Sequence, residues 1–170
     1  ARFEVDALYV PNADEIYPDR FATTVSVSRL TDVMEGALRP GHFDGMATVV
    51  TKLFLQTSAT DAFFGEKDFQ QLQVVRRLAA DLDIPITVHG CPTIREIDGL
   101  AMSSRNLLLS DRARVAAPLL HEEMEKLVEG VGAGQSFDEL QRAAIDRLEK
   151  SGFTKIEYLE IPANDDLTLL

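Results

Sequence analysis

The chain has 170 residues, of which 45% are hydrophobic, so it can bury the core of one ordinary domain or slightly more. It carries 17 Lys and Arg against 28 Asp and Glu, a formal net charge of −11, and so acidic a chain has no general attraction for a nucleic-acid backbone. No apolar run approaches the roughly 18 residues of a membrane span, and the start of the chain lacks the pattern of a signal peptide.

These properties predict a cytoplasmic protein whose partners include neither nucleic acid nor a membrane. Cys91 is the only cysteine, which excludes an intrachain disulfide and fits a reducing compartment. Because cations are scarce, a site for a phosphorylated ligand has to gather them locally. Clusters of Lys, Arg and His are therefore the informative features of this sequence.

The first third of the chain predicts two strands followed by helices. Residues 5–10 (VDALYV) form a short apolar run typical of a buried strand, and residues 23–28 (TTVSVS) alternate like a half-buried strand. Thr31 is a candidate N-cap for a short helical turn. Residues 36–45 hold three Gly and one Pro, which indicates a loop, and residues 45–56 carry apolar side chains at helical spacing.

The middle of the chain predicts a helix between two short apolar strands. Residues 61–64 predict a strand, residues 68–82 a helix with apolar face Leu72, Val75, Leu78, Ala79 and Leu82, and residues 84–88 the next strand. This order is typical of a parallel α/β sheet, in which ligands bind beyond the carboxyl ends of the strands. Gly65 to Lys67 follows one such end, and residues 91–106 follow another.

From Ser110 onward the pattern changes to that of a small α+β domain. A helix is predicted from Ser110 to Glu129 and a Gly-rich break over residues 130–134. A second helix is predicted from Ser136 to Lys150 with a capping box, and an alternating strand over residues 155–161. The predicted domains are residues 1–108, a parallel α/β sheet, and residues 109–170, the α+β part.

Two cationic segments are candidate phosphate sites. Arg39 and His42 precede a predicted helix, whose N-terminus attracts anions, although a plain surface loop explains them as well. In Gly65-Glu-Lys-Asp68, Gly65 permits close approach of a ligand, Lys67 offers a point charge for a phosphate, and Asp68 can accept hydrogen bonds from ribose hydroxyls. The alternative is that Asp68 only caps the following helix and that Lys67 is solvated.

A third candidate is Met102-Ser-Ser-Arg-Asn106, which follows a turn at Asp98-Gly99. Two hydroxyls and a guanidinium in adjacent positions suit a phosphate clamp, although many loops contain these residues. The sequence has no Gly-rich phosphate-binding fingerprint and no Cys/His cluster for zinc, so no metal ligands are predicted. His89 and His121 are isolated, and a structural or solvated role is expected for both.

In their order and intervals, these segments resemble the pantothenate synthetase (pantoate–β-alanine ligase) family. The similarity rests on GALRPGHFDG, VVTKLF, FFGEKDFQQL and IREIDGLAMSSRN, and it extends from Val5 to the end of the chain. The family belongs to the nucleotidyltransferase superfamily. The resemblance therefore implies that residues 1–108 are the C-terminal portion of a Rossmann-like nucleotide-binding domain.

The resemblance also implies a reaction and its partners. Members of the family use ATP and Mg²⁺ to join pantoate to β-alanine through pantoyl adenylate, as part of pantothenate biosynthesis, and they are dimers. A homodimer is therefore expected here, with residues 23–28 as a candidate contact strand.

Site residues follow from the matched motifs. The resemblance implies catalytic roles for Lys67, Ser103, Ser104 and Arg105, which contact the phosphates of ATP. It implies further ATP contacts by Gly65, Asp68, Ile94 and Met102, pantoate contacts by Gln71, Val49 and Val50, and a place near the active-site entrance for Arg39 and His42.

One family signature, a PTMGxLHxGH stretch with two catalytic His residues, is absent from the chain. We expect it upstream of Ala1 and expect little ligase activity from residues 1–170 alone. Two alternatives stay open: another adenylyltransferase of the superfamily, or a non-catalytic oligomerising fragment. A generic α/β domain without a site would require the three motifs to occur in order by chance.

Overall fold

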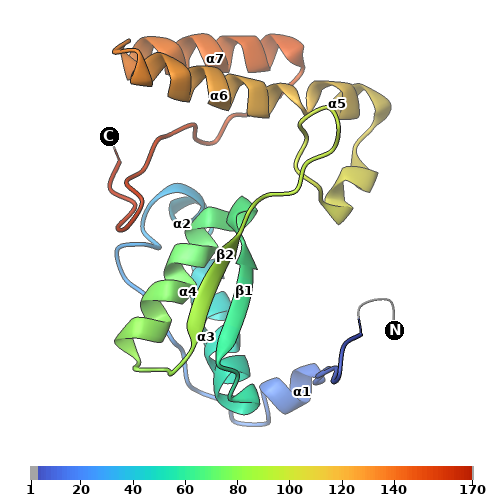
Figure 1. The fold of residues 1–170 in the computed structure, drawn as a ribbon, viewed down its shortest axis with the longest axis vertical. Coiled ribbons are helices and arrows are strands. Elements are labelled where there is room, and N and C mark those ends of the chain that lie inside the picture. Colours follow the sequence, from blue (N-terminus) through green and yellow to red (C-terminus); the bar gives the residue numbers. More distant parts are fainter. Residues whose placement is uncertain (1–3, 170) are drawn as a thin grey trace. The chain divides into compact units, whose positions relative to one another are not determined.

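The computed structural model describes residues 4 to 169, and Figure 1 shows their helices and strands. In chain order the elements are α1 (Ala13–Ile16), α2 (Met34–Leu38), α3 (His42–Thr57), β1 (Asp61–Gly65), a 3₁₀ turn (Glu66–Asp68), α4 (Phe69–Asp81), β2 (Thr87–Cys91), a second 3₁₀ turn (Ser104–Leu108), α5 (Asp111–Ala116), α6 (Leu119–Gly132) and α7 (Phe137–Ser151).

The sheet of the described residues consists of β1 and β2, which lie side by side and parallel, with α4 as their crossover (Figure 1). The predicted α/β class and the predicted strand–helix–strand order are both confirmed. β2 begins at Thr87, three residues after the predicted start, and the Thr87 N–H donates to Thr60 O at 2.8 Å. Pro85 explains the delay, because proline has no N–H to donate to a strand partner.

The region from 36 to 45 was predicted as a loop, and most of it is helical. α2 reaches Leu38 and α3 begins at His42, directly after Gly41 in the left-handed conformation with φ 77°. α3 confirms the helix predicted over residues 45–56 and begins three residues earlier, and its buried apolar side chains are Phe43, Ala47, Val50 and Phe54. In α4 the predicted apolar face is buried except for Leu82, which lies beyond the last helical residue and is exposed.

Two predicted strands are wrong because no neighbouring strand pairs with them in the described chain. Residues 5–10 are not a strand, and Val5, Leu8 and Val10 are exposed. Residues 155–161 are also irregular, although Ile156, Leu159 and Ile161 pack on a core cluster. An alternating pattern reports which side chains are buried, whereas a strand also requires a partner for its backbone.

The predicted strand over residues 23–28 is wrong for the same reason. Val27 is buried and Val25 is half-buried, as the alternation predicts, but the Val25 N–H donates to the Thr48 hydroxyl at 2.9 Å. Thr31 does not cap α2, since its hydroxyl donates to Val27 O at 2.8 Å. Polar groups of this segment thus find their hydrogen-bond partners in a side chain of α3 and in a local turn, and not in a neighbouring strand.

The chain divides into two compact units, which we describe separately. The first contains the residues up to Ala62 together with Gln73–His89. The second contains Phe63–Leu72 and the residues from Gly90 onward. The first unit has a core of buried apolar side chains contributed mainly by α3 and α4: Ile16, Val27, Leu30, Phe43, Ala47, Val50, Phe54, Val74, Val75, Leu78 and Ala79.

In the second unit, α6 and α7 pack against each other (Figure 1). The helix predicted over residues 110–129 is interrupted at Pro118, which stands at the N-cap of α6, because proline disrupts a helix interior. α6 then continues to Gly132, through part of the predicted break. At Gly130 an added Cβ would lie 2.6 Å from the Leu140 side chain of α7, so a larger residue would require that side chain to move. α7 matches its prediction, but Ser136 makes no side-chain cap.

Candidate active site

The segment after β1 presents Lys67 and Asp68 to solvent. β1 ends at Gly65, and the 3₁₀ turn Glu66–Asp68 leads into α4 without burying any of its three residues. Lys67 Nζ and Asp68 Oδ1 form an ion pair at 3.2 Å. A Cβ added to Gly65, whose φ is −71°, would meet no atom within 4 Å. The fold itself does not require a glycine here, so the open backbone is available to a ligand.

The first turns of α4 carry three glutamines with different environments. Gln71 is half-buried, whereas Gln70 and Gln73 are only 5% and 7% exposed. Buried amides are costly unless they are hydrogen-bonded, and helix-surface glutamines are normally solvated. The family resemblance singled out Gln71, and nothing in the sequence indicated that Gln70 and Gln73 are buried.

Residues Ile94 to Met102 form a short hairpin that joins two of the predicted ATP contacts. The Met102 N–H donates to Ile94 O at 2.9 Å, and the Glu96 N–H donates to Leu100 O at 2.8 Å. The turn occurs at Asp98-Gly99, as predicted, with Gly99 at φ 88°. The side chains of Ile94 and Met102 are 67% and 57% exposed, which provides an apolar surface beside the Ser-Ser-Arg segment.

Ser103, Ser104 and Arg105 lie on one 3₁₀ turn. Ser103 is its N-cap, and its hydroxyl accepts a hydrogen bond from the Arg105 N–H at 3.2 Å. The Asn106 N–H donates to Ser103 O at 3.1 Å. This compact turn places two hydroxyls and one guanidinium at adjacent positions, which is the arrangement that the sequence predicted for contacting phosphates.

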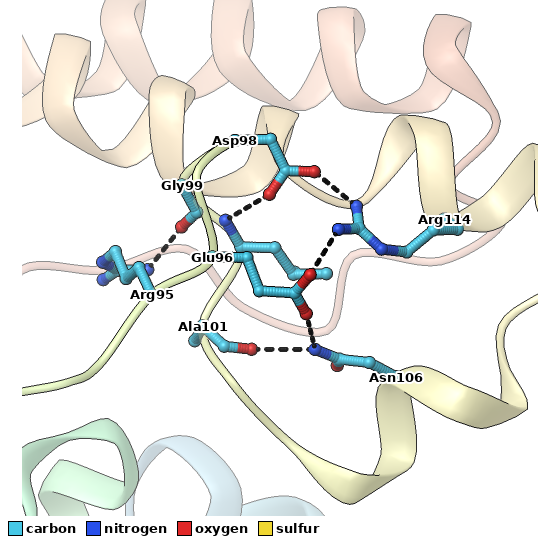
Figure 2. A network of polar contacts seen from close by, with 8 residues as sticks. Arg95, Glu96, Asp98, Gly99, Ala101, Asn106 and Arg114 are labelled. Carbon is cyan, nitrogen blue, oxygen red and sulfur yellow. Dashed lines mark hydrogen bonds and ion pairs between the residues drawn. The ribbon is translucent and has the colours of Figure 1, made fainter.

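A polar network, shown in Figure 2, connects this turn to the hairpin and to α5. Asn106 Nδ2 donates to Glu96 Oε1 at 3.1 Å and to Ala101 O at 3.0 Å. The Arg114 guanidinium contacts two carboxylates, Glu96 Oε2 at 2.7 Å and Asp98 Oδ2 at 2.5 Å. The hydrogen bond from Arg114 lowers the pKa of Asp98, and the Asp98 and Glu96 carboxylates raise the pKa of Arg114. The motifs gave no indication of this network.

The remaining predicted residues belong to the first unit. Arg39 forms an ion pair with Glu35, and His42 Nε2 lies 3.7 Å from the same carboxylate. Val49 is half-buried and Val50 is buried in α3. Arg39 also lines a polar cavity of about 470 Å³ together with residues of α2 and the start of α3, including Phe43 and Asp44. The Glu35 carboxylate reduces the positive charge that Arg39 offers to an anion.

The other two histidines have local partners. His89 Nε2 on β2 lies 2.7 Å from Asp61 Oδ1 on β1, and this hydrogen bond lowers the pKa of Asp61. His121 Nε2 lies 3.4 Å from Glu125 Oε1, one helical turn away in α6. Residues 4–169 include no group of three or more His, Cys, Asp or Glu that could hold a metal ion. In the same range no helix is long and apolar enough to cross a membrane.

Residues 1–169 match the family described as Pantoate-beta-alanine ligase. The chain belongs to the pantoate–β-alanine ligase family. It is 63% identical over 170 residues to a pantothenate synthetase of Roseobacter denitrificans and 59% identical over 170 residues to one of Ruegeria pomeroyi. In both comparisons the whole chain is covered, and the chain spans about 60% of the relative's length.

Solved structures of the ligase family share this fold. A crystal structure of pantothenate synthetase from Thermus thermophilus matches with a TM-score of 0.92 and 46% identity, covering 99% of this chain and 62% of that one. The pantoate–β-alanine ligase from Francisella tularensis, complexed with beta-gamma ATP and β-alanine, matches with a TM-score of 0.68 and 31% identity. That match covers 86% of this chain and 54% of the Francisella chain. The recognition of the family from the motif order is therefore confirmed.

Proposed function

We propose that the protein carrying this chain joins pantoate to β-alanine at the expense of ATP. A pantoate carboxylate oxygen attacks the α-phosphorus of ATP, the bond to the β-phosphate breaks, and pyrophosphate leaves. The β-alanine amine then attacks the acyl carbon of pantoyl adenylate, loses a proton, and displaces AMP. Neither step needs a nucleophile from the protein, so the protein's task is to align anions and to stabilise charge.

The observation that carries this proposal is that the residues assigned to the phosphates lie in one compact unit. Lys67 and the Ser103–Arg105 turn both belong to the second unit, although about 35 positions separate them in sequence. In a chain of net charge −11, a site for an anionic ligand needs cations that are gathered locally. Lys67 and Arg105 contact the phosphates in this proposal, with Ser103 and Ser104 as hydroxyl donors.

The remaining ATP contacts in this proposal are those that the family resemblance implies, and the structure at each position is compatible with them. Gly65 and Asp68 contact the ribose, where the open backbone at Gly65 leaves room for it. The exposed apolar surface of Ile94 and Met102 suits adenine, which also meets the backbone of Ile94.

The contacts to pantoate are proposed as the family resemblance implies them. Gln71, Val49 and Val50 contact pantoate, and Arg39 and His42 lie near the entrance. We also propose a homodimer in the cytoplasm.

We propose that Mg²⁺ binds to this site together with ATP. The described residues contain no cluster of three metal-binding side chains, and Mg²⁺ is usually held by substrate phosphates, waters and one or two carboxylates. Glu66 and Asp68 are exposed carboxylates on either side of Lys67, and Glu66, which this proposal does not assign to the ribose, could serve as such a ligand. When bound, the ion would neutralise phosphate charge as phosphorus is attacked.

The test is pantoate-dependent exchange of labelled pyrophosphate into ATP by the full-length protein that carries this sequence. Lys67→Met should reduce the exchange rate by about 10²–10³-fold, the range for loss of one transition-state contact. Lys150→Met is the matched control, since Lys150 is an exposed lysine on α7 that pairs only locally with Asp146. Exchange that proceeds equally well without pantoate would identify a different adenylyltransferase, and an unaffected Lys67→Met variant would exclude the proposed phosphate contact.

A further inference from the structure

The Ser104–Leu108 turn has no apolar anchor of its own. None of its residues is buried, and its two leucines, Leu107 and Leu108, are 89% and 83% exposed. A five-residue 3₁₀ turn is too short to be stable by its own hydrogen bonds. Contacts to the rest of the unit must therefore keep Ser103, Ser104 and Arg105 in one conformation.

The polar network of Figure 2 supplies such contacts in a continuous chain of side chains. Asn106 is the only residue of the turn in it, and its amide is held by Glu96 and by Ala101 O. Glu96 uses its second oxygen to accept from Arg114, which also holds Asp98 at the hairpin tip. Arg114 lies on α5, whose first turn is capped by the Ser110 hydroxyl. The turn is thus connected to a helix through one carboxylate and one guanidinium.

We propose that Arg114, acting through Glu96 and Asn106, is a positioning residue that holds the Ser103–Arg105 turn in its phosphate-binding conformation. This inference rests on the proposed function, because it assigns the turn to ATP. Arg114 is suited to the role because its planar fork binds two carboxylates at once and fixes the hairpin relative to α5. A lysine at this position has a single ammonium group and cannot reproduce that geometry.

The kinetic consequence follows from the population of the ordered turn. If the turn is ordered in a fraction of molecules, the apparent dissociation constant of ATP rises by the inverse of that fraction. Arg114→Met should therefore raise the KM of ATP by about tenfold while kcat at saturating ATP stays close to wild type. Arg114→Lys should give an intermediate increase. A merely structural role would reduce the amount of active protein, which lowers kcat and leaves every KM unchanged.

The experiment has two arms, of which the first needs no activity. In the full-length protein that carries this sequence, hydrogen exchange should be faster at the Met102 and Asn106 amides in Arg114→Met, with the amides of α4 and α7 unchanged. Arg112→Met, on the same helix, is the matched control and should leave all of these amides unchanged. The second arm measures KM and kcat for ATP, pantoate and β-alanine in the full-length protein that carries this sequence, with the same variants.

The outcomes separate this inference from the proposed function. A rise confined to the KM of ATP, with local exchange at Met102 and Asn106, supports it. An active wild type with an unchanged ATP KM in Arg114→Met overturns it, as does uniform acceleration of exchange in both Arg114 variants. If the wild type has no ligase activity, the proposed function fails, and unchanged exchange at Met102 and Asn106 would then reject the positioning role as well.

Discussion

The buried carboxylate of Glu123 allows a quantitative prediction for the second unit. Its side chain has no exposed surface, and it accepts from Arg147 Nε at 2.7 Å and from Lys126 Nζ at 2.9 Å. Arg147→Ala removes the stronger partner from α7 and leaves Glu123 with Lys126 alone. Breaking a fully buried pair costs about 3–5 kcal/mol, whereas an exposed pair contributes about 0–1 kcal/mol. Because Arg147 is about half exposed, we expect an intermediate loss of about 2–3 kcal/mol.

The assay is thermal and urea unfolding of the wild type and of Arg147→Ala. In a chain of this size about 1 kcal/mol lowers Tm by about 2–4 °C, so the expected decrease is about 4–12 °C. Lys150→Ala is the matched control, because it removes an exposed ion pair from the same helix, and it should change the free energy of unfolding by less than about 0.5 kcal/mol. Equal effects of the two substitutions would refute the argument that burial of Glu123 decides the cost.

The same cluster predicts how the effect depends on pH. The hydrogen bond from Arg147 lowers the pKa of Glu123 below its ordinary value, so the folded state binds this proton more weakly than the unfolded state. The stability it contributes is fully present above the ordinary Glu pKa and is lost as the pH falls through the lowered value. The difference between wild type and Arg147→Ala should therefore shrink in that acidic range. A difference that stays constant there would show that packing, and not charge, explains the loss.

Two further predictions concern glycines whose added Cβ would or would not clash, and the hydrogen-bonded pair of His89 on β2 and Asp61 on β1. Gly36→Ala should destabilise the protein by at least about 1–3 kcal/mol in urea unfolding, because the new Cβ would lie 2.1 Å from Thr31 O; Gly45→Ala, with open space around it in α3, should stabilise by about 0.5–1 kcal/mol. His89→Phe should raise the pKa of Asp61 in an NMR titration, since the hydrogen bond from His89 is the main cause of its lowered value; the stability from this pair should be present above the ordinary Asp pKa and disappear as the pH falls through the lowered one.

The elements predicted correctly are those in which local pattern and tertiary environment agree. β1, α4 and α7 have the periodicity, length and flanking residues of their type, and the structure confirms them. The order of elements also predicted that Lys67 follows a strand and that Arg105 follows the turn at Asp98-Gly99, whereas the hairpin from Ile94 to Met102 was not predicted. The predicted roles of these residues remain predictions.

What the sequence could not provide is the identity of contact partners far along the chain. Residues 23–28 have the alternation of a strand, but Thr48 on α3 takes the place of a neighbouring strand. Glu123 reads as one more charge on an acidic helix, and only the packing of α6 on α7 reveals that it is buried against Arg147. Such pairings depend on tertiary geometry, which periodicity does not encode.

The two parts of the proposed phosphate site are therefore held by different kinds of interaction. Lys67 directly follows β1, whose backbone is paired with β2, so the position of Lys67 is set by main-chain hydrogen bonds that most substitutions leave intact. The Ser103–Arg105 turn depends on contacts between side chains, namely those of Asn106, Glu96 and Arg114. Substitutions outside the site should consequently affect ATP binding mainly through this turn. Changes on α5 that leave Arg114 in place should have little effect, because the guanidinium is the only α5 side chain in the network drawn in Figure 2.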